Sequence, residues 1–166
     1  MKMIDYFYLQ HRYSAWVNER LYAVCHKMSD RERKRDLGAF FHSLHGTLNH
    51  LLLVDRLWLY RLTGQPVSYL TLDQKLYADF ANLHAAQRTT DTELGEFLRG
   101  LDEEILERRI GYVSLSTGQE KSLPVQTMLT TLFMHKIHHR GQVSALISQL
   151  GYDYGGIDFI CAPFVS

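Results

Sequence analysis

The 166-residue chain contains 18 lysine or arginine and 18 aspartate or glutamate residues, so its formal net charge is zero at pH 7. This balance gives no electrostatic reason to expect nucleic-acid binding, which depends on a basic surface. Hydrophobic residues make up 46% of the chain and charged residues 22%, which is typical of one globular domain over residues 1–166. We expect a cytoplasmic protein, because its two cysteines, Cys25 and Cys161, are far apart in the sequence and fit free thiols in a reducing compartment. We expect no membrane partner, because no apolar run is long enough to span a bilayer.

The first predicted helix covers residues 2–28. Its inner stripe is mostly apolar but includes His11 and Asn18. Each of these polar side chains could hydrogen-bond a neighbouring helix or lie near a metal ion. Ser29 and Glu32 have the spacing of a capping box, which predicts a short helical turn after the first helix.

The second predicted helix covers residues 36–63 and ends at Gly64. Apolar residues surround much of this helix between Leu51 and Leu62, which indicates a central position in the fold. His50 stands at the edge of this apolar run. A buried imidazole without a partner costs about 1–3 kcal/mol, and a metal ion is one possible partner. His50 is therefore our candidate for a ligand from this helix.

The middle of the chain is less regular. Residues 67–72 predict a loop, and a helical pattern resumes at Asp73. The segment 90–93 has the pattern of a new helix start, so the sequence predicts either one kinked helix or two. Residues 111–123 alternate and contain a turn, which predicts a short hairpin-like excursion.

The last predicted helix begins after Pro124, ends at Leu150 and contains two histidines on its apolar stripe. His135 and His139 are four residues apart, so their rings lie one turn apart on the same side. This spacing chelates metal in zinc proteases, but it also fits core histidines with ordinary hydrogen bonds. The rest of the stripe is apolar and consists of Val125, Met128, Leu132, Val143, Leu146 and Leu150.

Four long amphipathic helices with little strand predict an all-α four-helix bundle. Metal sites in such bundles are built from side chains on facing helices, which fits a site shared by the second and last helices. Three motifs then carry a resemblance to a known family: Tyr13-x-x-Trp16-x-Asn18-x-x-Leu21, Asn49-His50-Leu51-Leu52 and His135-x-x-x-His139-Arg140-Gly141-Gln142. With these motifs the chain resembles the DinB/YfiT-like family of predicted metalloenzymes, which are four-helix bundles.

The resemblance implies a divalent metal ion, most often nickel or zinc, held by His50, His135 and His139. It also implies a homodimer, as in many members of the family. Some relatives are transferases that use low-molecular-weight thiols, and one is a thiol-dependent isomerase. The expected partners are therefore a small-molecule thiol and an electrophile.

Three neutral imidazoles leave at least one coordination position open, which is typical of a catalytic site. The expected function is a thiol-dependent transferase for small electrophiles, or a hydrolase that activates water. The alternative is a non-catalytic bundle in which the metal is structural or serves a stress-associated ligand sensor. The candidates for supporting the ligands or lining the pocket are His11, Asn18, His138, Arg140 and Gln142, and Asp158 could add a carboxylate from the tail. For Arg140, an ion pair on the helix surface explains the residue as well as a role at the site does.

Overall fold

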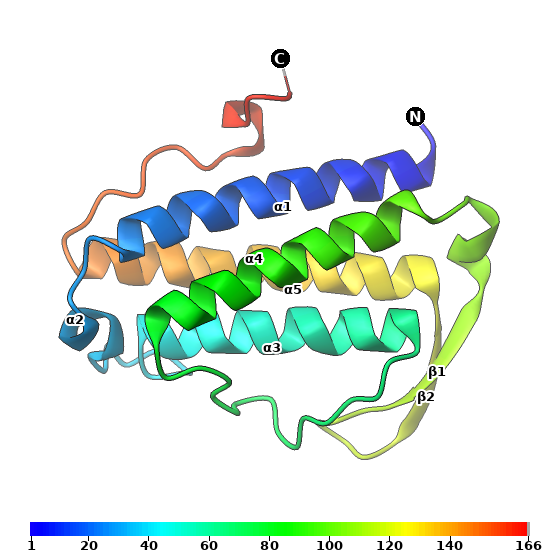
Figure 1. Ribbon diagram of the computed structural model, residues 1–166, viewed down its shortest axis with the longest axis horizontal. Helices are drawn as coiled ribbons and strands as arrows, with labels where there is room; N and C mark the ends of the chain where they lie inside the picture. The colour runs from blue at the N-terminus through cyan, green and yellow to red at the C-terminus, as the bar shows by residue number, and fades with distance from the viewer. Residues whose placement is uncertain (166) are drawn as a thin grey trace.

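Four long helices lie side by side in the computed structural model, which describes residues 1–165 (Figure 1). They are α1 (Met3–Cys25), α3 (Leu44–Thr63), α4 (Phe80–Arg99) and α5 (Val125–Gln149). The expected all-α bundle is thereby confirmed. The shorter elements are the helix α2 (Asp30–Lys34), the antiparallel strands β1 (Arg109–Val113) and β2 (Glu120–Pro124), and the 3-10 helices η1 (Glu104–Glu107) and η2 (Phe159–Cys161). The two strands form the predicted hairpin, which lies at one end of the bundle.

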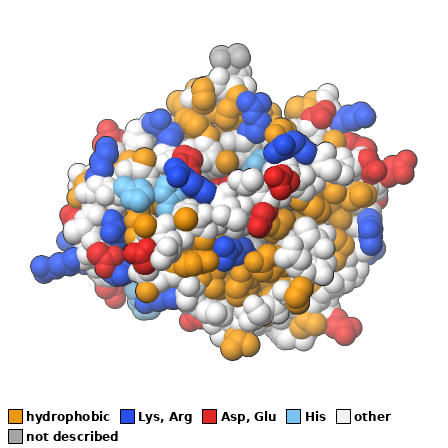
Figure 2. Space-filling view, viewed as in Figure 1, with side chains coloured by type: hydrophobic (Ala, Val, Ile, Leu, Met, Phe, Trp, Pro, Cys, Tyr) orange, Lys and Arg blue, Asp and Glu red, His pale blue; other side chains and the backbone are white. Residues whose placement is uncertain are grey.

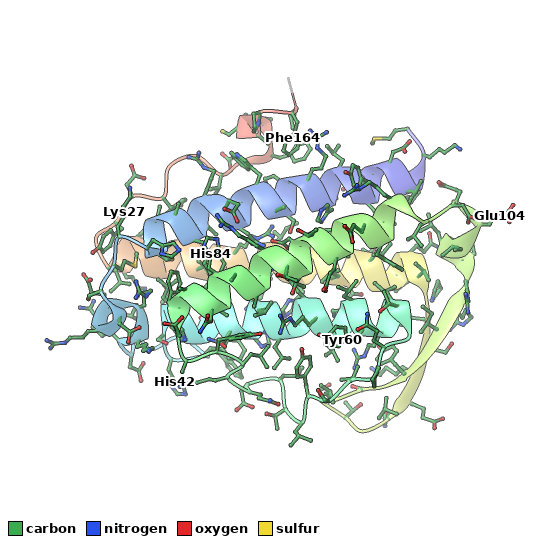
Figure 3. All side chains as sticks on the ribbon, viewed as in Figure 1. Lys27, His42, Tyr60, His84, Glu104 and Phe164 are labelled. Carbon is green, nitrogen blue, oxygen red and sulfur yellow. The ribbon has the colours of Figure 1, made fainter. Side chains whose placement is uncertain are left out.

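The second helix begins later than the sequence predicts. Its first residue is Leu44, because the Ser43 side chain accepts a hydrogen bond from the backbone of Gly46 and caps the helix there. The preceding residues form a turn that contains His42, which is labelled in Figure 3. The backbone φ of His42 is 65°. The helix ends at Gly64, as predicted, in the left-handed conformation that a glycine adopts readily.

The third long helix also differs from its prediction. It begins at Phe80 instead of Asp73, because the Asp79 carboxylate caps the backbone of Asn82. It then continues without a new start at residues 90–93. Thr90 and Asp91 resemble a helix cap in the sequence, but both are buried and hydrogen-bond other side chains inside the bundle.

The apolar core is divided into two clusters with a polar layer between them. One cluster lies towards α2 and includes Leu21, Leu52 and Leu83. The other lies towards the hairpin and includes Leu94 and Met128. The buried polar residues of the four helices come mainly from the intervening turns. Most of the buried polar and charged side chains therefore lie in the middle of the bundle.

The C-terminal segment packs back along α1 (Figure 1). The Tyr13 hydroxyl donates a hydrogen bond to the carbonyl of Ile157 at 2.7 Å, and the guanidinium of Arg12 lies 4.2 Å from the centre of the Phe164 ring. Figure 3 labels Phe164 in this segment. Asp158 lies close enough to Tyr13 to contribute to the raised pKa of its hydroxyl, although burial is the main cause. The Asp158 carboxylate therefore lies beside α1.

Charged side chains of both signs are interspersed over the face shown in Figure 2. This mixture agrees with the zero net charge of the chain and shows no single-sign field on this face. Among the described residues, no helix combines the length and the apolar character needed to cross a membrane.

Two helical glycines give the first prediction. A Cβ atom added at Gly95 would lie 2.6 Å from Nε2 of the buried His11, whereas one added at Gly141 would meet nothing within 4 Å. We expect Gly95→Ala to lower the free energy of unfolding by about 1–3 kcal/mol because the added methyl group displaces the buried His11 ring. Gly141→Ala should raise it by about 0.5–1 kcal/mol because alanine favours the helix. Urea unfolding of both variants tests this difference. An equal change in the free energy of unfolding for the two variants would show that the His11 side chain can move aside without loss of stability.

Candidate metal centre

Three histidine side chains from two helices meet in the middle of the bundle. His50 projects from α3, and His135 and His139 project from successive turns of α5. Nε2 of His50 lies 3.1 Å from Nε2 of His135, and the His50 and His139 rings are 4.6 Å apart between centroids. One ring nitrogen from each residue lies within 4.8 Å of the other two. The structure thus brings together the three residues that the sequence singled out.

Hydrogen bonds orient two of the three rings. Nδ1 of His50 donates to the carbonyl of Leu72 at 2.7 Å, and Nδ1 of His139 donates to Oε1 of Gln142 at 2.8 Å. Since these oxygens only accept, the proton of each neutral ring is on Nδ1 and the lone pair of Nε2 faces the centre. Nδ1 of His135 is buried and has no hydrogen-bond partner within residues 1–165. Gln142 therefore supports a candidate ligand, the kind of role considered for it from the sequence.

The donor set fits a borderline transition metal. Bonds of 2.0–2.1 Å in a tetrahedral site place neighbouring nitrogens about 3.3 Å apart, close to the 3.1 Å between His50 and His135. Three imidazoles without a carboxylate suit zinc or nickel better than magnesium or calcium. Phe41 stacks on the ring of His50 at 3.9 Å and meets His139 edge-on at 5.7 Å, so it shields one side of the site.

The three rings are neutral at pH 7. Burial, followed by the neighbouring imidazoles, lowers the pKa of His135 from 6.5 to about 3. Burial likewise lowers the pKa of His139 to about 4, against the opposing hydrogen bond to Gln142, and it lowers the pKa of His50. Neutral imidazole is the form that binds metal, so no proton has to be displaced from the ligands at neutral pH.

A cavity of about 420 Å³ adjoins His50 and His135 of the three histidines. His50 and His135 form part of its wall, and the remaining wall comes from α3, α5, the β1–β2 hairpin and the loop at Leu72. This volume is in the range that holds a small organic molecule. The part of the site formed by His50 and His135 is therefore reachable by a ligand.

Two charged residues that follow the histidines on α5 are buried, which the sequence did not indicate. Lys136 is 1% exposed and pairs with Asp55, and its Nζ lies 3.5 Å from Oδ1 of Asp91. Arg140 donates to Oδ1 of Asn18 at 3.2 Å and to the carbonyl of Ser14 at 2.9 Å. Arg140 is thus inside the bundle and does not form a surface ion pair.

These charges belong to one network that joins all four long helices. Asp91 on α4 accepts from Asn18 of α1 at 2.7 Å and from Gln87 at 3.2 Å. Gln87 also donates to Asp55 of α3 at 2.9 Å. Burial raises the pKa of Asp55, and the ammonium of Lys136 opposes this shift. Because Lys136 and Arg140 follow His135 and His139 directly, the network fixes the rotation of α5 that turns the imidazoles towards α3.

The remaining candidates occupy different places. His11 lines an open cleft between α1 and α4 beside Gly95, and it is not in the wall of the cavity next to the histidines. His138 is exposed, with its ring edge-on to that of His139 at 4.7 Å. Asn18 serves the buried network. Of the five supporting residues suggested by the sequence, Gln142 hydrogen-bonds a member of the histidine triad, and His138 packs against one and contacts Gln142.

The sequence model of the DinB family matches residues 3–164. The chain belongs to the DinB family. A curated DinB relative, Protein DinB of Bacillus subtilis (strain 168), is 22% identical over 171 residues, which cover 92% of this chain and 94% of the relative. The fold is also similar to the crystal structure of a DinB-like protein from Bacillus cereus ATCC 10987. That comparison has a TM-score of 0.61 and 20% identity, and it covers 84% of this chain and 89% of the other.

Proposed function

We propose that this DinB family protein is a metal-dependent enzyme whose divalent ion, nickel or zinc, is held by His50, His135 and His139. One observation carries the proposal: three ring nitrogens from α3 and α5 lie within 4.8 Å of one another. Two of these rings are oriented by hydrogen bonds from Nδ1, an arrangement common among metal-binding histidines.

When bound, a divalent ion with an open position favours the ionised form of a coordinated thiol or water molecule. The residues around the site determine which molecules can reach the ion. His50 and His135 form part of the wall of the cavity, so a small molecule inside the cavity meets the site. Phe41 covers the rings of His50 and His139 and keeps solvent from that side. We propose thiol-dependent transfer to a small electrophile as the reaction and water-dependent hydrolysis as its variant.

A non-catalytic bundle with a structural metal or a sensing role is the alternative. Structural metal sites occur where a small domain lacks a sufficient core. Here two apolar clusters and the buried ion-pair network already join the four helices without the histidine triad. A cavity that reaches the triad also favours a site that exchanges small molecules.

His135→Ala is therefore expected to leave a folded protein that binds divalent metal at least about 100-fold more weakly, because one of three ligands is lost. Elemental analysis of protein purified without a histidine tag measures the metal, and circular dichroism measures the fold. His26→Ala is the matched control, since this exposed histidine follows α1 and packs against Phe80 and His84, so the substitution should leave metal binding unchanged. Unfolding of His135→Ala would instead support a structural metal.

Activity is tested with the metal-loaded protein, a panel of low-molecular-weight thiols and small electrophiles, and a readout of thiol consumption. Absence of turnover over a broad panel would favour the non-catalytic alternative. The homodimer implied by the family remains part of the proposal, and light scattering on the same samples tests it.

A further inference from the structure

The cavity beside the histidine triad runs along α3. Four of its wall residues, His50, Val54, Leu57 and Arg61, recur at intervals of three or four along this helix. They therefore follow one face of the helix. Arg61 is eleven residues beyond His50, which at 1.5 Å per residue is about 16 Å along the axis. The wall thus extends from His50 and His135 towards the β1–β2 hairpin.

The hairpin end of the cavity carries positive charge. Arg61 and Lys121 both line it, together with the hydroxyl-bearing Ser114 and Ser116. Among the described residues of this wall, none is acidic. Within residues 1–165, neither Arg61 nor Lys121 forms a salt bridge. The two cations are therefore not paired with a carboxylate of the described residues.

Arg61 is held in position by its surroundings. Its guanidinium lies 4.1 Å from the centre of the Tyr112 ring and 4.9 Å from that of the Trp58 ring. It also donates one hydrogen bond to the carbonyl of Val113 at 3.0 Å. A guanidinium has five N–H donors, so donors remain for an anion, and its planar shape suits a carboxylate.

The part of the wall between the two ends is apolar. It includes Val54, Leu57, Trp58, Leu72 and Leu123. An apolar pocket with a few polar groups at defined positions binds a ligand in one orientation. The cavity therefore combines nitrogens for a metal at one end, an apolar middle and cations at the other end.

We infer that the cavity binds an apolar thiol that carries a carboxylate, with the carboxylate at Arg61 and Lys121 and the sulfur at the histidine triad. The placement of the sulfur rests on the proposed metal function, whereas the carboxylate subsite does not. A charge-assisted hydrogen bond between an arginine or lysine and a carboxylate is stronger than a neutral one, so the anion provides both affinity and orientation. The cations thereby select which thiols can present sulfur to the metal.

Two matched probes test the subsite: 4-(mercaptomethyl)benzoate and its neutral amide, 4-(mercaptomethyl)benzamide. They share the ring and the thiol and differ in the charge. Quenching of the fluorescence of Trp58, which lines the cavity, reports binding, in a Trp16→Phe background and with both metal-free and zinc-loaded protein. We expect the benzoate to bind about tenfold more tightly than the amide in both forms, which is the effect of one charge-assisted hydrogen bond.

Charge variants then locate the subsite. Lys121→Met should remove most of the preference for the benzoate, and Lys121→Glu should make the amide the better ligand. Arg61→Lys keeps the charge and should retain part of the preference, which avoids the loss of packing that Arg61→Met would cause at Trp58 and Tyr112. Arg108→Met is the control, because it removes an exposed cation just before β1 and outside this cavity wall.

The outcomes separate the subsite from the metal function. Equal affinity for the two probes, or no binding of the benzoate, overturns the carboxylate subsite even if zinc binds to the triad. A preference for the benzoate that depends on Lys121 supports the subsite even if zinc fails to bind. In that last case the proposed metal function is the part that fails.

Discussion

Lys136→Met is expected to lower the free energy of unfolding by about 3–5 kcal/mol, the range found when one partner of a buried ion pair is removed. The variant leaves two carboxylates inside the bundle without their ammonium group. Asp55 is 2% exposed, so water cannot replace the lost charge there, and Asp91, at 8% exposed, is only partly reached by water from the cleft between α1 and α4. Chemical denaturation followed by circular dichroism measures the change.

Two further variants make this prediction specific. Asp55→Asn combined with Lys136→Met removes both charges of the closest pair and should recover a large part of the lost stability. Lys34→Met breaks the pair between Lys34 and Asp30, whose side chains are 41% and 57% exposed, and should cost no more than about 1 kcal/mol. If Lys136→Met proved as mild as Lys34→Met, the buried network would not be what holds α5 against α3 and α4.

The histidine triad could be found from the sequence because its signal lies within single helices. His135 and His139 interrupt one apolar stripe at helical spacing, and the periodicity of that stripe fixes which way they point. His50 stood out as a polar residue beside an apolar run. The spacing of residues within one helix does not show which helices are its neighbours. The prediction that His50 of α3 lies near His135 and His139 of α5 therefore depended on the bundle architecture and the family resemblance.

The buried network could not be found in the same way. Lys136 and Arg140 follow the histidines by one residue, so they lie about 100° further around α5 and look like flank residues. Their burial depends on partners from three other helices, above all Asp55 and Asp91. No local pattern links residues that lie 45 to 126 positions apart in the chain.

The two incorrect helix starts have a related cause. A capping residue is recognised by the hydrogen bond it makes, and several nearby serine, threonine and aspartate residues could make one. Ser43 and Asp79 cap their helices, whereas Thr90 and Asp91 are used inside the bundle. Tertiary contacts thus decide whether a serine, threonine or aspartate caps a helix or is buried inside the bundle.

The metal-free protein is expected to lose stability steeply as the pH falls from 6.5 towards 4. Burial lowers the pKa of His11 and His139 to about 4 and that of His135 to about 3, from 6.5 in each case. At a pH between the lowered pKa of such a histidine in the folded protein and its pKa of 6.5 in the unfolded chain, the unfolded chain binds a proton that the folded chain does not. Each such histidine therefore stabilises the fold fully above pH 6.5 and loses this contribution as the pH falls, by roughly 3 kcal/mol for His11.

A bound divalent ion should move this loss to lower pH, because it binds the folded chain and competes with protons for the three imidazoles. With ordinary pKa values the metal would leave below about pH 6.5. The lowered pKa values of His135 and His139 instead predict that metal is retained at about pH 5 and released together with the fold nearer pH 4. Parallel titrations of bound metal and of circular dichroism measure both events.

His11→Gln provides the matched control for this prediction. It removes one acid-sensitive histidine outside the wall of the cavity beside the triad, so it should lower the pH at which the metal-free protein unfolds and leave metal binding at pH 7 unchanged. Gradual release of metal from pH 6.5 with an intact fold would contradict the prediction. It would mean that the imidazoles of α3 and α5 titrate as they do in water, and that burial does not keep them neutral for the metal.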